Sequence, residues 1–348
     1  MKKILALILT VITVLGCVVM PTFAADEYVY PQKREDFTIR DPFVLVHEGK
    51  YYMYGTGLAG RGYGCVISEN LEDWTYPIQV FTPDECFDGI KDFWAPECHY
   101  YNGKFYLFAT YFSGETQHRG VGIFVADEPT GPFTQLGDGH ITPHDRDSID
   151  GTLYVDGDGQ PWMVYVREWT SAEDEVGEMA IAKLSENLDC FISEPKIIFR
   201  ADGHLWTDSH VTDGPFLYRT ENGRLLMLWS NSAKQGGYAV GVAWSDNNEI
   251  TGKWKHQPSA LYRKDMYHEL DGGHGMIFRT LDGQLMMSIH SPNSQTEEHR
   301  TTAVFIPIKD TGNSIVLAEN YTPFRNFLYK FVVLFRKIYY GITGLFVK

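Results

Sequence analysis

The chain has 348 residues, of which 44% are apolar and 22% are charged, and its formal net charge is −15. A chain of this size and apolar content can bury a sizeable core, which excludes an intrinsically disordered protein. The excess of acidic over basic residues also argues against a nucleic-acid binder, because polyanions need a basic surface. The high aromatic share, 14%, favours β-structure.

The first 24 residues have the pattern of a secretory signal peptide. Lys2 and Lys3 precede an apolar stretch from Ile4 to Met20, and small residues then predict cleavage after Ala24. We therefore expect a secreted or cell-surface protein. Lipoprotein anchoring at Cys17 is the weaker alternative, because the leucine before its neighbouring glycine fits a lipoprotein site poorly.

One sequence pattern returns five times after this segment: an apolar run, a turn that contains glycine, and a second apolar run. Its copies open at intervals of about 60 residues, at Asp41, Ala95, Asp150, Asp213 and Gly273. The turns read EGK, NGK, DGQ, NGR and DGQ, and they suit tight hairpins because glycine accepts a positive φ. No long helical periodicity appears between residues 35 and 318.

Five such units, with weaker strand pairs between them, predict an all-β fold. We expect a five-bladed β-propeller of about four strands per blade, forming a single domain over residues 33–318. A β-sandwich is the structural alternative, but it does not explain five similar openings at near-even spacing. Four cysteines remain in the mature chain, and because their spacing suits neither a disulfide framework nor a zinc site, we expect buried free thiols.

The C-terminal segment, residues 320–348, differs in composition from the repeats. It is basic and very apolar, and we expect it to be a helical tail. Such a tail either contacts a membrane surface or packs on the domain. Lys330 and the Arg336-Lys337 pair interrupt its apolar run, which argues against a transmembrane span.

Propeller geometry brings the repeat openings together at one end of a central channel. Asp41, Asp150 and Asp213 therefore converge. Carboxyl groups crowded in one pocket cannot all ionise at ordinary pKa values, so one becomes an acid near neutral pH while another stays ionised as a base. Glycosidic bond cleavage needs such a pair. The alternative is that these aspartates, in Asp-Pro and Asp-Gly pairs, only cap turns.

The second strand of each repeat returns towards the same end of the channel. Its last residues, together with a tryptophan of the second opening, are expected to line the pocket and bind substrate: Trp94, Arg167, Trp169, Asn231 and His290. Aromatic rings offer apolar faces to a sugar, and an acidic pocket does not exclude a neutral one.

The five openings resemble those of glycoside hydrolase family 43. The similar segments are Arg40-Asp41-Pro42, Trp94-Ala95-Pro96-Glu97, Ser148-Ile149-Asp150-Gly151, Thr212-Asp213-Gly214-Pro215 and Gly273-His274-Gly275. The family contains arabinanases, β-xylosidases and α-L-arabinofuranosidases. The resemblance therefore implies hydrolysis of arabinosyl or xylosyl bonds in plant polysaccharides such as arabinan or arabinoxylan, by an inverting single displacement.

The resemblance also implies roles for individual residues. Asp41 is similar to the general base that activates water, and Asp150 to the aspartate that raises the pKa of the acid. His274 is similar to the central histidine that in some members helps to hold a cation, often calcium. We expect such an ion at the propeller centre to be unnecessary for the chemistry itself. A buried, hydrogen-bonded neutral histidine is the alternative for His274.

The acid position departs from the family pattern, which is Glu-Gly-Pro where this chain has Asp213-Gly214-Pro215. Aspartate is one methylene shorter, and a misplacement of about 1 Å can cost a hundredfold in rate. Either Asp213 is the acid on a shifted backbone, or it orients substrate while Glu168 donates the proton. Glu97 and Glu178 are weaker candidates.

Three other functions stay open on the sequence alone. The chain could be a non-catalytic carbohydrate-binding propeller, since the acid is changed. It could be a retaining, fructan-type propeller glycosidase, whose two carboxyl groups lie about 5 Å apart. It could also be an adhesion or scaffold propeller held at the membrane by its tail.

Overall fold

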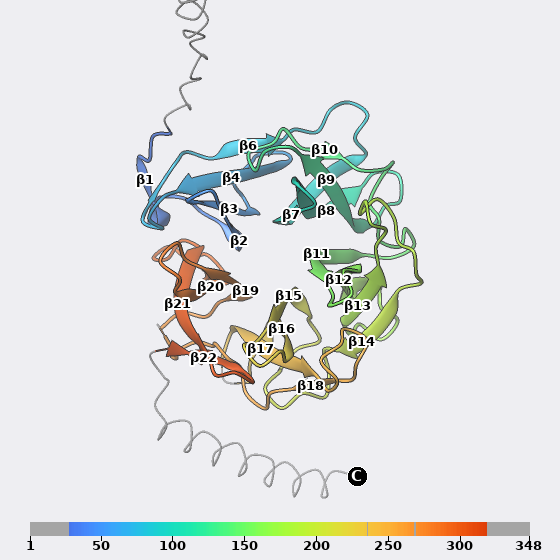
Figure 1. Ribbon diagram of the computed structural model, residues 1–348, viewed down its shortest axis with the longest axis vertical. Coiled ribbons are helices and arrows are strands. Elements are labelled where there is room, and N and C mark those ends of the chain that lie inside the picture. Colours follow the sequence, from blue (N-terminus) through green and yellow to red (C-terminus); the bar gives the residue numbers. More distant parts are fainter. Residues whose placement is uncertain (1–27, 235, 268, 319–348) are drawn as a thin grey trace, which may run out of the picture.

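Five antiparallel four-stranded sheets stand around a common centre in the computed structural model, which describes residues 28–318 except residues 235 and 268 (Figure 1). The predicted five-bladed β-propeller is confirmed. The signal peptide predicted over residues 1–24 and the tail predicted over residues 320–348 lie outside the described residues. Within the described part of the chain, no helix is long and apolar enough to span a membrane.

Each blade is built from strands that follow one another along the chain, with the first strand innermost. Blade 1 consists of β2 (Arg40–His47), β3 (Lys50–Thr56), β4 (Tyr63–Ser68) and β6 (Ile78–Phe81). Blade 2 consists of β7 (Gly89–Tyr101), β8 (Lys104–Ser113), β9 (Arg119–Ala126) and β10 (Thr134–Gln135). Blade 3 consists of β11 (Ser148–Val155), β12 (Pro161–Arg167), β13 (Glu178–Lys183) and β14 (Lys196–Arg200).

The last two blades follow the same order. Blade 4 consists of β15 (Asp213–Arg219), β16 (Leu225–Ser232), β17 (Tyr238–Ser245) and β18 (Trp254–His256). Blade 5 consists of β19 (Gly273–Arg279), β20 (Leu285–Ser291), β21 (Thr302–Asp310) and β22 (Ile315–Leu317). Outside the blades, β1 (Gln32–Lys33) pairs with β5 (Asp73–Trp74), and two short 3₁₀ turns cover Arg34–Asp36 and Trp169–Ser171.

The hairpin turns and the core have the physical basis that the repeats predicted. Asn102 and Gly103, in the turn of blade 2, both have positive φ (47° and 81°), as a type I′ hairpin requires. Buried side chains from facing blades interleave, so the apolar core lies between blades rather than at the ring centre. The cysteines are free as predicted, but only Cys65 and Cys98 are buried, whereas Cys86 and Cys190 are exposed.

Every inner strand is irregular at the end where the repeats open. The pairing register between first and second strands shifts there in all five blades. One residue at each shift has a left-handed backbone, with φ between 42° and 55°: Asp41, Ala95, Asp150, Gly214 and His274. Non-glycine residues seldom adopt this conformation, and it recurs at functional sites.

The backbone N–H groups of these five residues join each blade to the preceding one. In four blades the acceptor is a side chain on the second strand of the preceding blade. In that preceding blade, the accepting residue pairs with the residue directly before the left-handed one. The pairs are Asp41 to His290 (3.1 Å), Ala95 to Thr56 (2.8 Å), Asp150 to Thr110 (3.0 Å) and His274 to Ser230 (2.8 Å).

Blade 4 is the exception to this ring of hydrogen bonds. The equivalent position in blade 3 is Val166, which pairs with Ile149 and offers no side-chain acceptor. The N–H of Gly214 donates instead to Oδ2 of Asp150, at 3.0 Å. In blade 4 the backbone N–H of Gly214 is therefore bound to Asp150, one of the carboxyl groups that the sequence places at the end of the channel.

Candidate active site

Asp41 is held from three sides at the mouth of the channel. Its Oδ1 lies 3.2 Å from Nδ1 of both His274 and His290, and its Oδ2 accepts a hydrogen bond from Thr56 at 2.7 Å. Burial alone would raise the pKa of Asp41, but the charge and hydrogen bond of His274 hold that pKa well below its usual value. Asp41 is therefore ionised at neutral pH.

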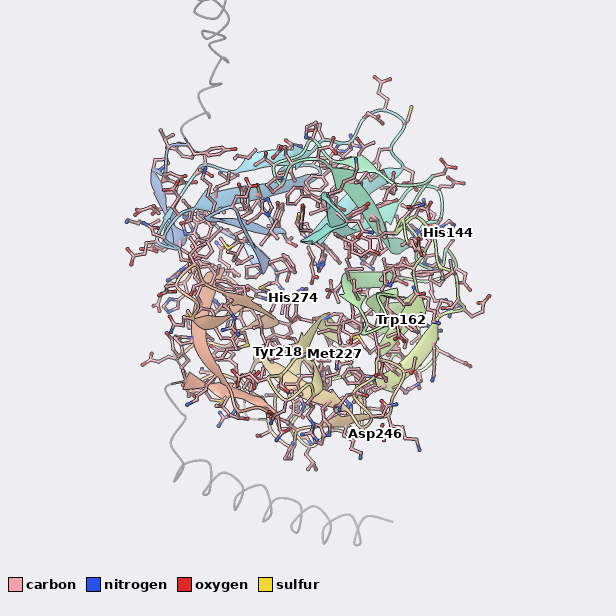
Figure 2. The ribbon with its side chains drawn as sticks, in the orientation of Figure 1. His144, Trp162, Tyr218, Met227, Asp246 and His274 are labelled. Atoms are coloured by element: carbon pink, nitrogen blue, oxygen red, sulfur yellow. The ribbon has the colours of Figure 1, made fainter. Side chains whose placement is uncertain are left out.

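His274 is the cation of this group and lies near the centre of the ring (Figure 2). Besides Asp41, its Nδ1 has Oδ2 of Asp150 at 3.8 Å. Burial alone would lower the pKa of His274, but the charges of Asp41 and Asp150 raise it to about 10. The ring packs against Gly214, where a Cβ would lie 2.7 Å from it. The neutral histidine that the sequence left open is therefore not what this environment favours.

Asp150 occupies the centre of the cluster. It is buried, and it accepts the Gly214 N–H described above. Burial raises the pKa of Asp150 to about 6, against the opposing charge of His274. A neighbouring negative charge at this position favours the protonated form of any carboxyl group packed beside it.

Asp213 is a carboxyl group on which the charge of Asp150 acts. It accepts a hydrogen bond from the hydroxyl of Tyr238 at 2.9 Å. Burial, and after it the charge of Asp150, raise the pKa of Asp213 well above its usual value. Asp213 is not equivalent to Asp41 and Asp150 in the repeat, however. It stands one residue before the left-handed position, which Gly214 occupies.

His290 supports Asp41 rather than facing a ligand. It is fully buried, and its Nδ1 accepts the Asp41 N–H, so its proton is on Nε2, 3.3 Å from Oδ1 of Asn293. Burial lowers the pKa of His290, which keeps the ring neutral. Asn293 in turn accepts a hydrogen bond from Arg40 at 3.1 Å, so this chain of contacts ties blade 5 to blade 1.

Glu168 lies in a second cluster between blades 2 and 3. Its Oε2 is 2.9 Å from Nη1 of Arg119, and the Arg119 guanidinium stacks on Trp94 at 5.0 Å from the ring centroid. Burial raises the pKa of Glu168 to about 7, although Arg119 opposes this shift. Asp147 and Asp150 also raise the pKa of Glu168, so the two clusters are electrostatic neighbours.

The other predicted substrate residues lie around blades 3 and 4. Arg167 pairs with Glu178 at 2.9 Å, and Asn231 is fully buried. The amide of Asn231 donates to the carbonyls of Ser209 (3.1 Å) and Val211 (2.5 Å), so it holds a loop rather than presenting itself to a ligand. Of the weaker acid candidates, Glu97 contacts His99 at 3.2 Å, and Glu178 is shared by Arg167 and Arg200.

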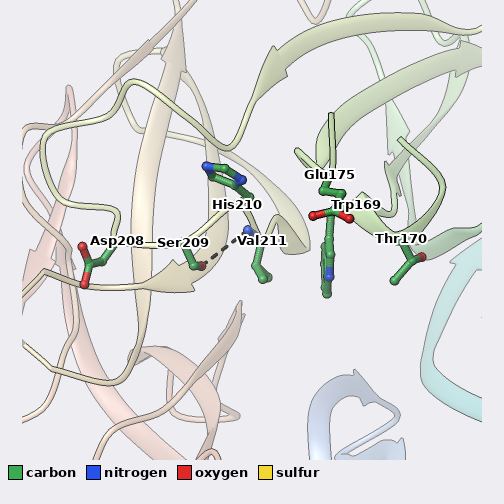
Figure 3. A pocket seen from close by; sticks show the side chains of 7 residues that line it. All are labelled: Trp169, Thr170, Glu175, Asp208, Ser209, His210 and Val211. Atoms are coloured by element: carbon green, nitrogen blue, oxygen red, sulfur yellow. Dashed lines mark hydrogen bonds between the residues drawn. The ribbon is translucent and has the colours of Figure 1, made fainter. Parts of the chain in front are cut away.

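Trp169 lines a pocket of about 470 Å³ with Thr170, Glu175, Asp208, Ser209, His210 and Val211 (Figure 3). We call it the Trp169 pocket. Trp169, Thr170 and Glu175 form one side, and residues 208–211 form the other. Both sides lie at the end of the propeller where the carboxyl groups converge, since Trp169 follows β12 and Val211 precedes β15.

Sequence reasoning missed Tyr238 and Arg119, and a simple signal would have found both. A third strand begins at the end where the second strand finishes, so its first residue reaches the site. Tyr238 is the first residue of β17, and Arg119 is the first residue of β9. The reasoning that places the last residues of the second strands at the pocket also places the first residues of the third strands there.

The cation that the resemblance places at His274, with water among its ligands, stays a prediction. Among residues 28–318, apart from the two omitted positions, no group of three or more His, Cys, Asp and Glu side chains is arranged to hold a metal ion. Nδ1 of His274 faces Asp41 at 3.2 Å, so Nε2 is the ring atom left for an ion. Since no such group of protein ligands surrounds His274 in the described part of the chain, no chemical step is assigned to an ion there.

The buried cluster favours opposite protonation states for two of its carboxyl groups. Asp41 is an ionised carboxylate able to accept a proton, and Asp213 is a protonated carboxyl group able to donate one. Burial, and after it the charge of Asp150, favours the neutral form of Asp213, whereas His274 favours the ionised form of Asp41. Pairs of carboxyl groups whose pKa values are driven apart carry out acid–base chemistry.

Comparison with known proteins gives one family. The family model described as "Glycosyl hydrolases family 43" matches residues 36–306. The chain is 36% identical to the structure of an endo-arabinase from Bacteroides thetaiotaomicron, with a TM-score of 0.72, covering 82% of this chain and 100% of that one. An endo-1,4-β-xylanase structure from the same organism is 27% identical with a TM-score of 0.70, covering 82% of this chain and 96% of that one.

Two further relatives match over a smaller share of the chain. Extracellular endo-α-(1→5)-L-arabinanase 1 of Bacillus subtilis is 26% identical over 142 residues, which cover 38% of this chain and 44% of the relative. α-L-Arabinofuranosidase 43 of Humicola insolens is 29% identical over 210 residues, covering 56% of this chain and 41% of the relative. The chain thus spans less than half the length of these two relatives.

Proposed function

The chain belongs to glycosyl hydrolases family 43, and we propose that it is an exported enzyme that hydrolyses arabinosyl or xylosyl bonds in arabinan- or arabinoxylan-type polymers. The observation that carries this proposal is that the buried cluster around His274 favours opposite protonation of two of its carboxyl groups, Asp41 and Asp213. A purely sugar-binding propeller has no need of carboxyl groups driven apart in this way.

The reaction we propose is a single displacement with inversion at the anomeric carbon. Asp41 takes a proton from a water molecule as the water oxygen attacks that carbon. Asp213 gives its proton to the departing glycosidic oxygen, so the bond to the leaving sugar breaks without forming an alkoxide. One proton is taken up and one is given out, which leaves Asp41 protonated and Asp213 ionised until they exchange with solvent.

Asp150 has the supporting role in this proposal. Its charge is the second cause, after burial, of the raised pKa of Asp213, so Asp150 helps to keep Asp213 protonated at neutral pH. Its hydrogen bond to the Gly214 N–H also fixes the peptide that follows Asp213. An asparagine at position 150 could still accept the Gly214 N–H through its amide oxygen, but it would remove the charge.

Glu168 is the second candidate for the acid, because burial raises its pKa to about 7 and Asp150 lies in its electrostatic neighbourhood. Its carboxylate is bound by Arg119, however, and an ion pair favours the ionised form. Asp213 accepts only the weaker, neutral hydrogen bond of Tyr238. We therefore place the acid at Asp213.

The substrate class and the export are supported by the relatives' names and by the N-terminal sequence. An endo-arabinase and a xylanase are among the similar structures, and two arabinanases of B. subtilis are described as extracellular. Contact of residues 320–348 with a membrane and a calcium ion at His274 stay predictions.

Release of reducing sugar from arabinan, arabinoxylan and unsubstituted xylan tests the function, with nuclear magnetic resonance to identify the first-formed anomer. We expect release from at least one pentose polymer, with the inverted anomer appearing first. Retention at the anomeric carbon would replace the single displacement by a double one. Binding without turnover would leave a carbohydrate-binding propeller.

A further inference from the structure

The Trp169 pocket is separate from the carboxyl cluster but is fastened to it on both sides. On one side, Trp169 directly follows Glu168, whose N–H donates to the carbonyl of Asp147 at 3.0 Å. Ser171 accepts the N–H of Asp147 at 3.0 Å through its hydroxyl. This wall is therefore anchored three residues before Asp150.

The opposite wall is anchored through Asn231. Its amide holds the carbonyls of Ser209 and Val211, and its Oδ1 accepts the Ser209 hydroxyl at 2.8 Å. The neighbouring residue, Ser230, accepts the N–H of His274. The loop of residues 208–211 therefore shares its support with the catalytic cluster, and it leads directly into Asp213.

A backbone hydrogen bond joins the two chain segments that carry the walls. The N–H of Gly177 donates to the carbonyl of His210 at 2.8 Å. A side chain at position 177 would collide there, since a Cβ would lie 2.6 Å from Oγ1 of Thr212 and 3.0 Å from the His210 carbonyl oxygen. Glycine at position 177 thus allows the two segments to approach closely.

The lining suits a neutral sugar ring. Trp169 supplies an aromatic surface of the kind that packs against apolar ring faces, and the exposed Glu175 and Asp208 supply carboxylate acceptors for hydroxyl groups. The seven lining residues include two carboxylates and no lysine or arginine, so the lining has net negative charge towards a sugar carboxylate even with His210 counted as a cation.

We propose that the Trp169 pocket binds a second, uncharged pentosyl unit of the chain being cleaved and selects against uronate-bearing chains. The inference rests on the proposed function for its substrate class. It goes further by assigning a binding unit outside the carboxyl cluster, so that catalytic efficiency depends on substrate length and charge.

The test uses Trp169→Ala, with Tyr76→Ala as the matched control because Tyr76 is an exposed aromatic residue (61%) between β5 and β6, outside the site. For Trp169→Ala we expect kcat/KM to fall about tenfold on a pentose oligosaccharide and by less than about twofold on an aryl pentoside. Tyr76→Ala should change neither. An equal fall on both substrates, or no fall on the oligosaccharide, would overturn the proposal.

The charge selectivity has its own variant. Glu175→Gln combined with Asp208→Asn should raise kcat/KM on a glucuronosyl-substituted oligosaccharide relative to the unsubstituted one by about tenfold, because like-charge contacts across an interface are costly. An unchanged ratio would remove this part of the inference.

Failure of the proposed function would be seen separately, as absence of hydrolysis by the unmodified enzyme. Binding of an arabino-oligosaccharide or xylo-oligosaccharide can then be measured by calorimetry. Trp169→Ala should raise the dissociation constant about tenfold. Equal affinities of the two proteins would contradict the pocket assignment whether or not hydrolysis occurs.

Discussion

The backbone N–H of Gly214 donates to Oδ2 of Asp150 across a blade boundary, at 3.0 Å. In the other four blades the equivalent N–H donates to a side chain on the second strand of the preceding blade. Here that position is Val166, whose side chain has no acceptor. Because this acceptor is missing, the strand that carries Asp213 is joined instead to Asp150, whose charge helps to raise the pKa of Asp213.

Gly214→Ala should damage the site and not only the fold. A left-handed φ of 50° costs an alanine about 1–2 kcal/mol, and the new Cβ would also lie 2.7 Å from the His274 ring. Gly159→Ala is the control, because Gly159 has φ 82° with nothing within 4 Å. We expect similar backbone strain in both variants. Only Gly214→Ala should lose activity, by about tenfold or more. Equal activities would contradict the close packing at His274.

Tyr238→Phe should move the alkaline limb of the kcat/KM profile to higher pH. The Tyr238 hydroxyl stabilises the ionised form of Asp213, so its hydrogen bond lowers the pKa of the acid. Removing it raises that pKa further, and the protonated acid persists to higher pH. We also expect a lower kcat, because the carboxyl group loses its orientation. An alkaline limb that stays in place would exclude Asp213 as the group titrating there.

His274 should make stability fall in the alkaline range. Its folded pKa of about 10 lies above the unfolded value of 6.5, so the stability it contributes is complete below pH 6.5 and is lost as the pH rises towards 10. Urea unfolding of the native protein should show this decline, at up to about 1.4 kcal/mol per pH unit. His274→Gln should flatten it. Parallel curves for the two proteins would mean that His274 is not protonated at neutral pH.

Asn231→Ala should release the loop of residues 208–211. The carbonyls of Ser209 and Val211 lose their buried donor, which typically costs about 1–3 kcal/mol in the free energy of unfolding. Because the loop lines the Trp169 pocket, we expect KM for oligosaccharides to rise more than kcat falls. A fall in kcat alone would place Asn231 within the chemistry rather than behind the loop.

The fold was predictable because it depends on local patterns that repeat. Turns such as that at Asn102 and Gly103 mark each hairpin, and their spacing gives five blades without any knowledge of long-range contacts. The convergence of Asp41, Asp150 and Asp213 follows from that topology. The one-residue offset of Asp213 could not be predicted, because it depends on which residue takes the left-handed bend.

The protonation states also lay beyond the sequence. A histidine at position 274 is compatible with a neutral, hydrogen-bonded ring, and only its contacts with Asp41 and Asp150 favour the imidazolium. Asn231 and His290 were correctly placed near the end of the channel, but both are fully buried. Whether such a side chain faces the ligand or a neighbouring loop is decided by packing between blades.

The measurement that tests the central claim most directly compares Asp213→Asn with Glu168→Gln on two substrates. One is an aryl pentoside with an activated leaving group, and the other is a natural pentose oligosaccharide. A missing acid matters only where the leaving oxygen needs a proton, and general acid catalysis contributes about 10²–10⁴-fold.

We predict that Asp213→Asn keeps most of its activity on the aryl pentoside and loses about 10²–10⁴-fold on the oligosaccharide. Glu168→Gln should lack this difference, and Asp41→Asn should lose activity on both substrates because the base is needed for each. A leaving-group difference in Glu168→Gln and none in Asp213→Asn would contradict the assignment of Asp213 as the acid.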